Sequence, residues 1–239
     1  MEEFGFSQGI IAVDIYGDGY MDVIESGRPE LNYDDRSNIL WLNDGKGGFT
    51  DASMKVGETF AREPGGLRCN GAVAADMDND GDLDIIVIGD RLRYYRNDGN
   101  LSFTELTDSC GLFVEMETYT IIVGDVDNDG YLDAFIPDQA EEFRIFKNLG
   151  NNRFKEKLKT GIKSPKRVND VPPDPRGAAF ADIDNDGDLD LVVANKSNYV
   201  QVFRNDLKSR NYLRFDLIGA NGDRGAIGTG IYVYPKGML

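Results

Sequence analysis

A nine-residue acidic motif that occurs four times constrains the fold of this chain more than any other feature of the sequence. Every copy has aspartate at positions 1, 5 and 9 and glycine at position 6, and three copies also have aspartate at position 3. The copies are residues 14–22, 76–84, 125–133 and 182–190, which we call loops 1 to 4. Self-similarity at an interval of roughly 50 residues indicates a repeated supersecondary unit.

Short apolar runs surround each loop in the same order. One run ends directly before the loop and a second begins directly after it, and a third run ends at an asparagine that follows an aromatic residue by two positions. In the first three units a glycine-containing turn and a fourth run follow, at 49–51, 103–105 and 154–156. Short runs rich in Ile, Val, Phe and Tyr between turn residues are typical of β-strands, and helix is expected to be scarce.

Four short strands per unit predict an all-β fold, a whole or partial β-propeller built from four-stranded blades with acidic hairpin loops. The units are expected at about 4–56, 66–108, 117–158 and 175–206. Small residues in the first run of two units agree with this, because inner strands converge at a propeller axis: Ala72, Ala74, Ala75, Ala178, Ala179 and Ala181. A β-sandwich of hairpin repeats has a similar strand pattern and remains an alternative.

The charge of the chain belongs mainly to the four loops. The sequence has 42 Asp plus Glu against 26 Lys plus Arg, a formal charge of −16, yet acidic and basic residues nearly balance outside the loops. A polyanion is not expected to bind nucleic acid through its phosphates or to associate with an anionic membrane by charge. The absence of histidine excludes a Ser-His-Asp triad and an imidazole metal site.

The carboxylates of one loop repel each other strongly, and a hard divalent cation removes that repulsion. Calcium takes about six to eight oxygen ligands, which a tight loop supplies as aspartate side chains at positions 1, 3, 5 and 9 and the backbone carbonyl of position 7. Magnesium demands stricter geometry, and an EF-hand needs flanking helices, so these are interpreted as calcium-binding hairpin loops. The predicted ligands of loops 2 to 4 are Asp76, Asp78, Asp80, Asp82 and Asp84; Asp125, Asp127, Asp129, Tyr131 and Asp133; and Asp182, Asp184, Asp186, Asp188 and Asp190.

Loop 1 differs from the others because Tyr16 replaces the position-3 aspartate. Its remaining predicted ligands are Asp14, Asp18, the carbonyl of Tyr20, and Asp22. We therefore expect three strong calcium sites and a weaker fourth site at residues 14–22. The alternative for each loop is a solvated acidic turn that binds no ion.

The pattern Asp-x-Asp-x-Asp-Gly-x-x-Asp between strands resembles the FG-GAP/VCBS repeats of integrin α-subunit-type β-propellers, over residues 4–206. The resemblance implies the same calcium ligands, with side chains at positions 1, 3, 5 and 9 and the carbonyl of position 7. Residues 211–219 and 225–233 resemble the start of an ASPIC/UnbV domain, as in the cartilage acidic protein-like family. Residues 207–239 are therefore expected to form ASPIC/UnbV-like strands, either incomplete or closing the propeller. Because family propellers usually have more blades than these four units, the chain is expected to be a fragment or a partial propeller.

The sequence also carries indications of location. No signal peptide and no apolar run long enough to span a membrane are found, so membrane insertion is not expected. Cys69 and Cys110 have no CxxC spacing and are either buried thiols or one disulfide. Extracellular calcium sites bind at roughly 10⁻⁴–10⁻³ M and are largely empty in the cytosol. We expect an extracellular, cell-surface or periplasmic protein.

The functional hypothesis is a non-catalytic module in which calcium is structural and the loops contact a protein or a glycan, as in adhesion. Three long insertions, 26–38, 57–68 and 159–176, are candidate contact loops. One alternative is a hydrolase or lyase that acts on a polysaccharide with a pair of carboxylates. Another is a subunit of an extracellular filament, in which self-assembly covers the exposed strand edges of an incomplete propeller.

Overall fold

The computed structural model describes residues 7–27, 36–114, 117–137, 143–157, 160–164, 174–196 and 199–207, together with 215, 217, 218 and 233. The chain forms two compact units, Met1–Lys208 and Ser209–Leu239. The predicted ASPIC/UnbV-like strands at 207–239 therefore lie outside the described residues, apart from Leu207 and the isolated positions. Residues 28–35 and 165–173 of two predicted insertions lie outside them as well.

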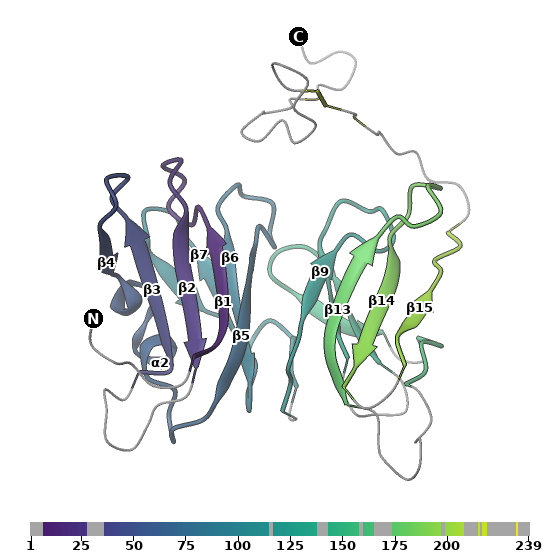
Figure 1. The fold of residues 1–239 in the computed structure, drawn as a ribbon, viewed down its shortest axis with the longest axis horizontal. Coiled ribbons are helices and arrows are strands. Elements are labelled where there is room, and N and C mark those ends of the chain that lie inside the picture. Colours follow the sequence, from purple (N-terminus) through teal and green to yellow (C-terminus); the bar gives the residue numbers. More distant parts are fainter. Residues whose placement is uncertain are drawn as a thin grey trace. The chain divides into compact units, whose positions relative to one another are not determined.

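The first unit contains four antiparallel sheets, each formed by strands that follow one another in the chain (Figure 1). Blade 1 contains β1 (Ser7–Val13), β2 (Asp22–Gly27), β3 (Asn38–Asn43) and β4 (Phe49–Asp51). Blade 2 contains β5 (Cys69–Ala75), β6 (Asp84–Gly89), β7 (Arg93–Asn97) and β8 (Phe103–Glu105). Blade 3 contains β9 (Ile122–Gly124), β10 (Asp133–Ile136), β11 (Arg144–Asn148) and β12 (Phe154–Lys157). The described part of blade 4 contains β13 (Pro175–Ala181), β14 (Asp190–Asn195) and β15 (Gln201–Phe203).

This arrangement confirms the prediction of a β-propeller over the β-sandwich alternative. The inner strands contact in succession, β1 with β5, β5 with β9 and β9 with β13, as neighbouring blades of a propeller do. The regular helices of the described residues are two single turns between β4 and β5, α1 (Ser53–Val56) and α2 (Glu58–Ala61). Helix is scarce, as the sequence predicts.

The hydrophobic core lies between blades, and strand alternation explains how one strand serves two interfaces. Successive side chains of a β-strand point to opposite faces of the sheet. In β6, Ile85 and Val87 belong to the cluster shared with blade 1, whereas Ile86 and Ile88 belong to the cluster shared with blade 3. A third cluster joins blades 3 and 4 and includes Phe135, Ile145, Leu191 and Val193. Every residue of β6 is therefore buried.

Small residues on the inner strands allow the blades to approach each other. A Cβ atom added to Gly9 in β1 would lie 2.8 Å from the Cα atom of Gly71 in β5. A Cβ atom added to Gly124 in β9 would lie 2.9 Å from side-chain atoms of Leu189 and Phe180 in blade 4. Real Cβ atoms do not come so close to other atoms, so larger side chains there would push neighbouring blades apart.

Each of blades 1 to 3 buries one face of its sheet against the next blade in the chain. The same face of blade 4 is exposed. The residue three positions before the conserved asparagine of the third strand is 0% exposed at Leu40 and Tyr94 and 8% exposed at Ile145, but Val202 in blade 4 is 61% exposed. The position-2 residue of the loop follows the same trend, since Ile15 is 3% exposed and Ile183 is 50% exposed. The face of blade 4 remote from blade 3 is thus an apolar surface that no described residue covers.

Both cysteines are free and buried. Cys69 belongs to the core cluster between blades 1 and 2, and Cys110 belongs to the cluster between blades 2 and 3. Burial raises the pKa of Cys69 to about 12, so this thiol is neutral at physiological pH. Of the two alternatives for these cysteines, the structure has the buried thiols. No helix among the described residues is long and apolar enough to cross a membrane.

Candidate metal centres

Each acidic loop is the hairpin turn between the first and second strands of its blade. In all four blades the position-9 aspartate begins the second strand and pairs with the last residue of the first: Val13 with Asp22, Ala75 with Asp84, Gly124 with Asp133 and Ala181 with Asp190. The loops are therefore flanked by strands on both sides, unlike EF-hand loops.

The same internal hydrogen bonds shape all four loops, as loop 2 illustrates. The Asp76 carboxylate accepts the backbone N–H of Asp80 at 3.1 Å and that of Gly81 at 3.0 Å. Asp80 accepts the N–H of Asp82 at 2.9 Å, and Asp84 accepts the N–H of Met77 at 3.1 Å. Loops 1, 3 and 4 repeat the bonds to the position-1 and position-5 carboxylates. These bonds hold the carboxylates on the inner side of a tight turn.

The turn needs two residues with left-handed backbone conformation. The glycine at position 6 has φ of 98° at Gly81, 92° at Gly130 and 94° at Gly187, values that other residues rarely adopt. Position 4 of the same loops is asparagine, the non-glycine residue that tolerates positive φ best, and φ is 63°, 54° and 63° at Asn79, Asn128 and Asn185. The Asn-x-Gly pattern in these loops therefore has a backbone cause.

The fold gathers one acidic triad in each of loops 2, 3 and 4. In every triad one carboxylate oxygen of each residue lies within 4.8 Å of the others: Asp76, Asp78 and Asp80; Asp125, Asp127 and Asp133; Asp182, Asp184 and Asp190. Each triad can hold a metal ion, and carboxylate oxygens at this separation suit calcium. The other predicted side-chain ligands, Asp84, Asp129 and Asp186, lie in the same loops but outside these triads.

Three carboxylate oxygens in these loops lack the hydrogen-bond partners that buried oxygens normally have. Among the described residues, Asp78 Oδ1 in loop 2, Asp133 Oδ2 in loop 3 and Asp188 Oδ1 in loop 4 are buried and accept no hydrogen bond. A buried acceptor without a partner is costly, and a bound cation would satisfy it. Burial raises the pKa of Asp84 and of Asp133 to about 6, and the negative charge of neighbouring aspartates in the same loop acts in the same direction. The residues present therefore fit a divalent cation.

Loop 1 has the same backbone turn but a smaller set of side-chain ligands. The Asp14 carboxylate accepts the N–H groups of Asp18 and Gly19 at 3.0 and 2.8 Å, as in the other loops. Tyr16 at position 3 is exposed and brings no carboxylate, and the described residues of loop 1 form no acidic triad. The predicted weaker site at 14–22 remains a prediction.

Loop 3 contains a feature that the sequence analysis missed, an internal cation. The ammonium group of Lys147 in β11 lies 2.7 Å from Asp129 Oδ2 and also pairs with Asp127 Oδ1. The equivalent residue of blade 2 is Arg96, which pairs with Asp98 outside loop 2, and that of blade 1 is Leu42. Lys147 thus neutralises two carboxylates that calcium would need.

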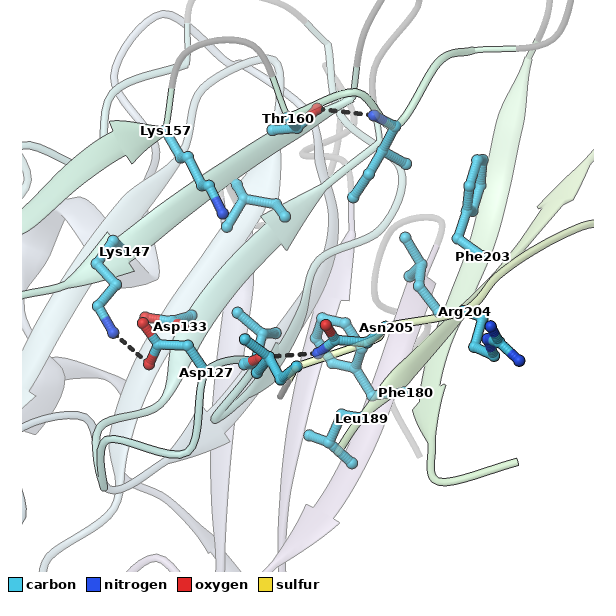
Figure 2. Close-up of a pocket in the computed structure, with 15 residues that line it drawn as sticks. Asp127, Asp133, Lys147, Lys157, Thr160, Phe180, Leu189, Phe203, Arg204 and Asn205 are labelled. Atoms are coloured by element: carbon cyan, nitrogen blue, oxygen red, sulfur yellow. Dashed lines mark hydrogen bonds and ion pairs between the residues drawn. The ribbon is translucent and has the colours of Figure 1, made fainter. Parts of the chain in front are cut away.

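A cavity of about 230 Å³ lies between blades 3 and 4 next to loop 3. Figure 2 shows Asp127, Asp133 and Lys147 at one side of it and Phe203 and Arg204 at the other. Its apolar lining consists mainly of Ile145, Ile162, Phe180, Leu189, Leu191 and Phe203. An apolar cavity with a few charged groups at the edge is the usual form of a small-ligand site.

These features define a class of protein, a β-propeller whose blades each carry an Asp-rich loop between their first two strands. The sequence profile of the FG-GAP-like repeat matches residues 14–87, 76–136 and 125–193, and each match contains two consecutive loops. Together the matches cover more than half of the chain. The chain therefore belongs to the FG-GAP-like repeat family, and the resemblance inferred from the loops is confirmed.

Similar curated proteins include cartilage acidic protein 1 of Xenopus tropicalis, which is 28% identical over 196 residues. The match covers 75% of this chain and 28% of that protein. Cartilage acidic protein 1 of Mus musculus is 28% identical over 195 residues, and this match covers 74% of this chain and 28% of that protein. The chain thus spans 28% of the length of these relatives.

A similar solved structure is that of an Agrocybe aegerita lectin, described for its specific recognition of non-reducing terminal N-acetylglucosamine. The match has a TM-score of 0.51 at 22% sequence identity and covers 80% of this chain and 52% of that chain. At this identity the likeness supports the propeller fold alone.

Lys147 competes with calcium for two carboxylates, so its removal should strengthen binding at loop 3. We expect Lys147→Met to raise the calcium affinity of loop 3 about two- to fivefold. This factor corresponds to the free energy of the two partly exposed ion pairs that calcium no longer has to displace. The measurement is calorimetric titration in a background in which Asp78→Asn and Asp184→Asn disable loops 2 and 4. Arg96→Met is the matched control and should change nothing, whereas an unchanged or weaker affinity in Lys147→Met would contradict the competition.

Proposed function

We propose that loops 2, 3 and 4 bind structural calcium and that loop 1 is a weaker fourth site. The observation that carries this is the recurrence of an acidic triad with buried, unpartnered carboxylate oxygens on the same hairpin turn. Side chains at positions 1, 3, 5 and 9 would hold the ion, together with the position-7 carbonyls of Asp82, Tyr131 and Asp188, and Tyr20 in loop 1. Calcium would relieve carboxylate repulsion and stiffen each hairpin.

We place the module outside the cytoplasm, where millimolar calcium would fill sites of this class. Its proposed role is non-catalytic contact with a protein or a glycan, as in adhesion. The cavity between blades 3 and 4 is the candidate contact site, since Phe180 and Phe203 offer apolar faces for a sugar ring beside the charged groups of loop 3. A lectin with the same fold supports the glycan alternative.

The enzyme alternative needs a pair of carboxylates outside the metal loops. Outside the loops, Glu63 and Glu105 both pair with the guanidinium group of Arg93. Hydrogen bonds from Thr59 and Arg93 outweigh the effect of burial and lower the pKa of Glu105, so this carboxyl group is poorly suited to act as a general acid. This arrangement favours the non-catalytic role.

A glycan array followed by an assay for new reducing ends separates these roles. We expect calcium-dependent retention of a glycan with no release of reducing ends, because the two carboxylates that line the cavity, Asp127 and Asp133, are proposed calcium ligands. The chelated protein serves as the control for calcium dependence. Turnover of a retained polysaccharide would instead support the enzyme.

Calcium removal should lower the melting temperature by at least about 10 °C, since each filled site contributes about 2.7 kcal/mol at a hundredfold excess over Kd. The variant Asp78→Asn should lose at least about a third of the calcium-dependent increase, because it disables one of the three strong loops. Without calcium this variant should melt no lower than the parent, since it removes charge repulsion.

The control for that experiment is Asp108→Asn, which removes an exposed carboxylate outside the loops. It should retain the full calcium response. Equal melting temperatures of the parent protein with excess calcium and with chelator would contradict the structural role of calcium.

The exposed face of blade 4 favours a second candidate function, self-assembly. At the first two interfaces an aromatic third-strand residue of the following blade is buried, Tyr95 in blade 2 and Phe146 in blade 3, and its equivalent at the third interface, Phe203, is partly buried. Trp41 holds that place in blade 1, where it is only half-buried and donates to Glu25 Oε2 at 3.3 Å. We propose that blade 1 of a second copy covers blade 4 of the first, so that Trp41 packs near Val202.

Val202→Glu places a charge in the centre of that proposed contact. We expect the parent chain to form dimers or larger species as its concentration rises, and Val202→Glu to remain monomeric, in light scattering coupled to size exclusion. Met54→Glu, at an equally exposed apolar residue of α1, is the control and should assemble like the parent. A parent chain that stays monomeric up to high concentration would refute self-assembly.

A further inference from the structure

Loops 2, 3 and 4 are connected to one another by asparagine side chains. The Nδ2 atom of Asn79 in loop 2 donates to the carbonyl oxygen of Gly130 in loop 3 at 2.9 Å. The Nδ2 atom of Asn128 in loop 3 donates to the carbonyl oxygen of Gly187 in loop 4 at 3.3 Å. Position 4 of one loop is thus bonded to position 6 of the next, in the same way at two successive interfaces.

These bonds lie between metal-ligating positions at both ends. Position 4 stands between the ligands at positions 3 and 5, and position 6 stands between the ligands at positions 5 and 7. Because the donor and acceptor belong to neighbouring turns, ordering one turn constrains the backbone of the other. The position-4 asparagine therefore has a second role beyond its left-handed conformation.

A second asparagine side chain, at or just after the end of a third strand, contacts the same loops. The side chain of Asn148, at the end of β11, donates to the carbonyl of Met77 in loop 2 at 2.7 Å and to that of Leu132 in loop 3 at 3.1 Å. Asn205 donates to the carbonyl of Val126 in loop 3 at 2.9 Å. Asn152 of blade 3 also donates to the Asp78 carboxylate in loop 2 at 2.8 Å. Asn148 thus joins the backbones of loops 2 and 3, and Asn152 bonds a predicted ligand of loop 2 to blade 3.

Loop 1 lacks the position-4 link. Its residue at position 4 is Gly17, which has no side chain, whereas loops 2 and 3 have asparagine there. The chain thus contains an internal comparison, three loops in a bonded series and one loop without the donor.

We propose that Asn79 and Asn128 act as positioning residues that couple calcium binding across loops 2, 3 and 4, so that these sites fill cooperatively and loop 1 fills independently. The proposal rests on the calcium sites proposed above. An ion at one loop fixes its turn, and the amide bond then lowers the ordering cost of the neighbouring turn. Coupling is reciprocal, so calcium at loop 3 strengthens loops 2 and 4 as much as they strengthen loop 3.

The test is calorimetric calcium titration of the full chain and of Asn79→Gly, Asn128→Gly and the double variant. Glycine keeps the positive φ of these positions and removes the amide. We expect the parent isotherm to be steeper than that of independent sites. Each variant should weaken the coupled sites by about two- to tenfold, the range for an exposed hydrogen bond, and the double variant should approach independent binding.

The matched control is Asn100→Gly, at an exposed asparagine with φ of 52° in the turn between β7 and β8. It should reproduce the parent isotherm. Variant isotherms that superimpose on that of Asn100→Gly would overturn the coupling and leave the calcium sites standing. A parent chain with no calcium heat and no calcium-dependent melting would overturn both.

A second measurement does not depend on the asparagine variants. Asp127→Asn disables loop 3 and should weaken calcium binding at loops 2 and 4 while leaving loop 1 unchanged. The same substitution in the double asparagine variant should have no effect on loops 2 and 4. Unchanged binding at loops 2 and 4 after Asp127→Asn alone would contradict the proposal.

Discussion

The buried aspartate at position 9 is the residue on which each blade and each acidic loop depend together. Its carboxylate lies at the base of the loop and accepts a backbone N–H from an asparagine. In blades 1 to 3 this asparagine ends the third strand and the distance is 2.8 Å, and in blade 4 it follows the third strand by two residues and the distance is 2.9 Å. The loop already joins the first and second strands of the blade, and this hydrogen bond also fixes it to the third strand. A charged, buried acceptor of this kind is stable only with such donors or a cation.

This placement makes the acidic loops part of the interfaces between blades. Asn148 and Asn205 donate to backbone carbonyls in the loop of the preceding blade. The hydroxyl of Tyr94 in the core contacts both Asp84 of loop 2 and Asn152 of blade 3. A change in charge or order at a loop therefore affects the interface between two blades. Calcium, if bound, would stabilise the relation between blades as well as each hairpin.

The sequence predicted the blades and the loops because both are local patterns. Alternating apolar runs, left-handed glycines and the aspartate spacing lie within one repeat, and each of them has a direct backbone consequence. Contacts between repeats were not predictable in the same way. The pairing of Lys147 with loop 3 and the donation from Asn79 to Gly130 depend on how closely neighbouring blades approach, which glycine and alanine on the inner strands decide. The recurrence of asparagine at position 4 of the loops was the one sequence signal that could have indicated the bond from Asn79 to Gly130.

The central claim is that the acidic loops are calcium sites, and anomalous diffraction from crystals grown with calcium tests it most directly. We predict an anomalous peak inside each of loops 2, 3 and 4, surrounded by oxygens of positions 1, 3, 5, 7 and 9, and a weaker peak or none at loop 1. Loops without anomalous density at saturating calcium would contradict it.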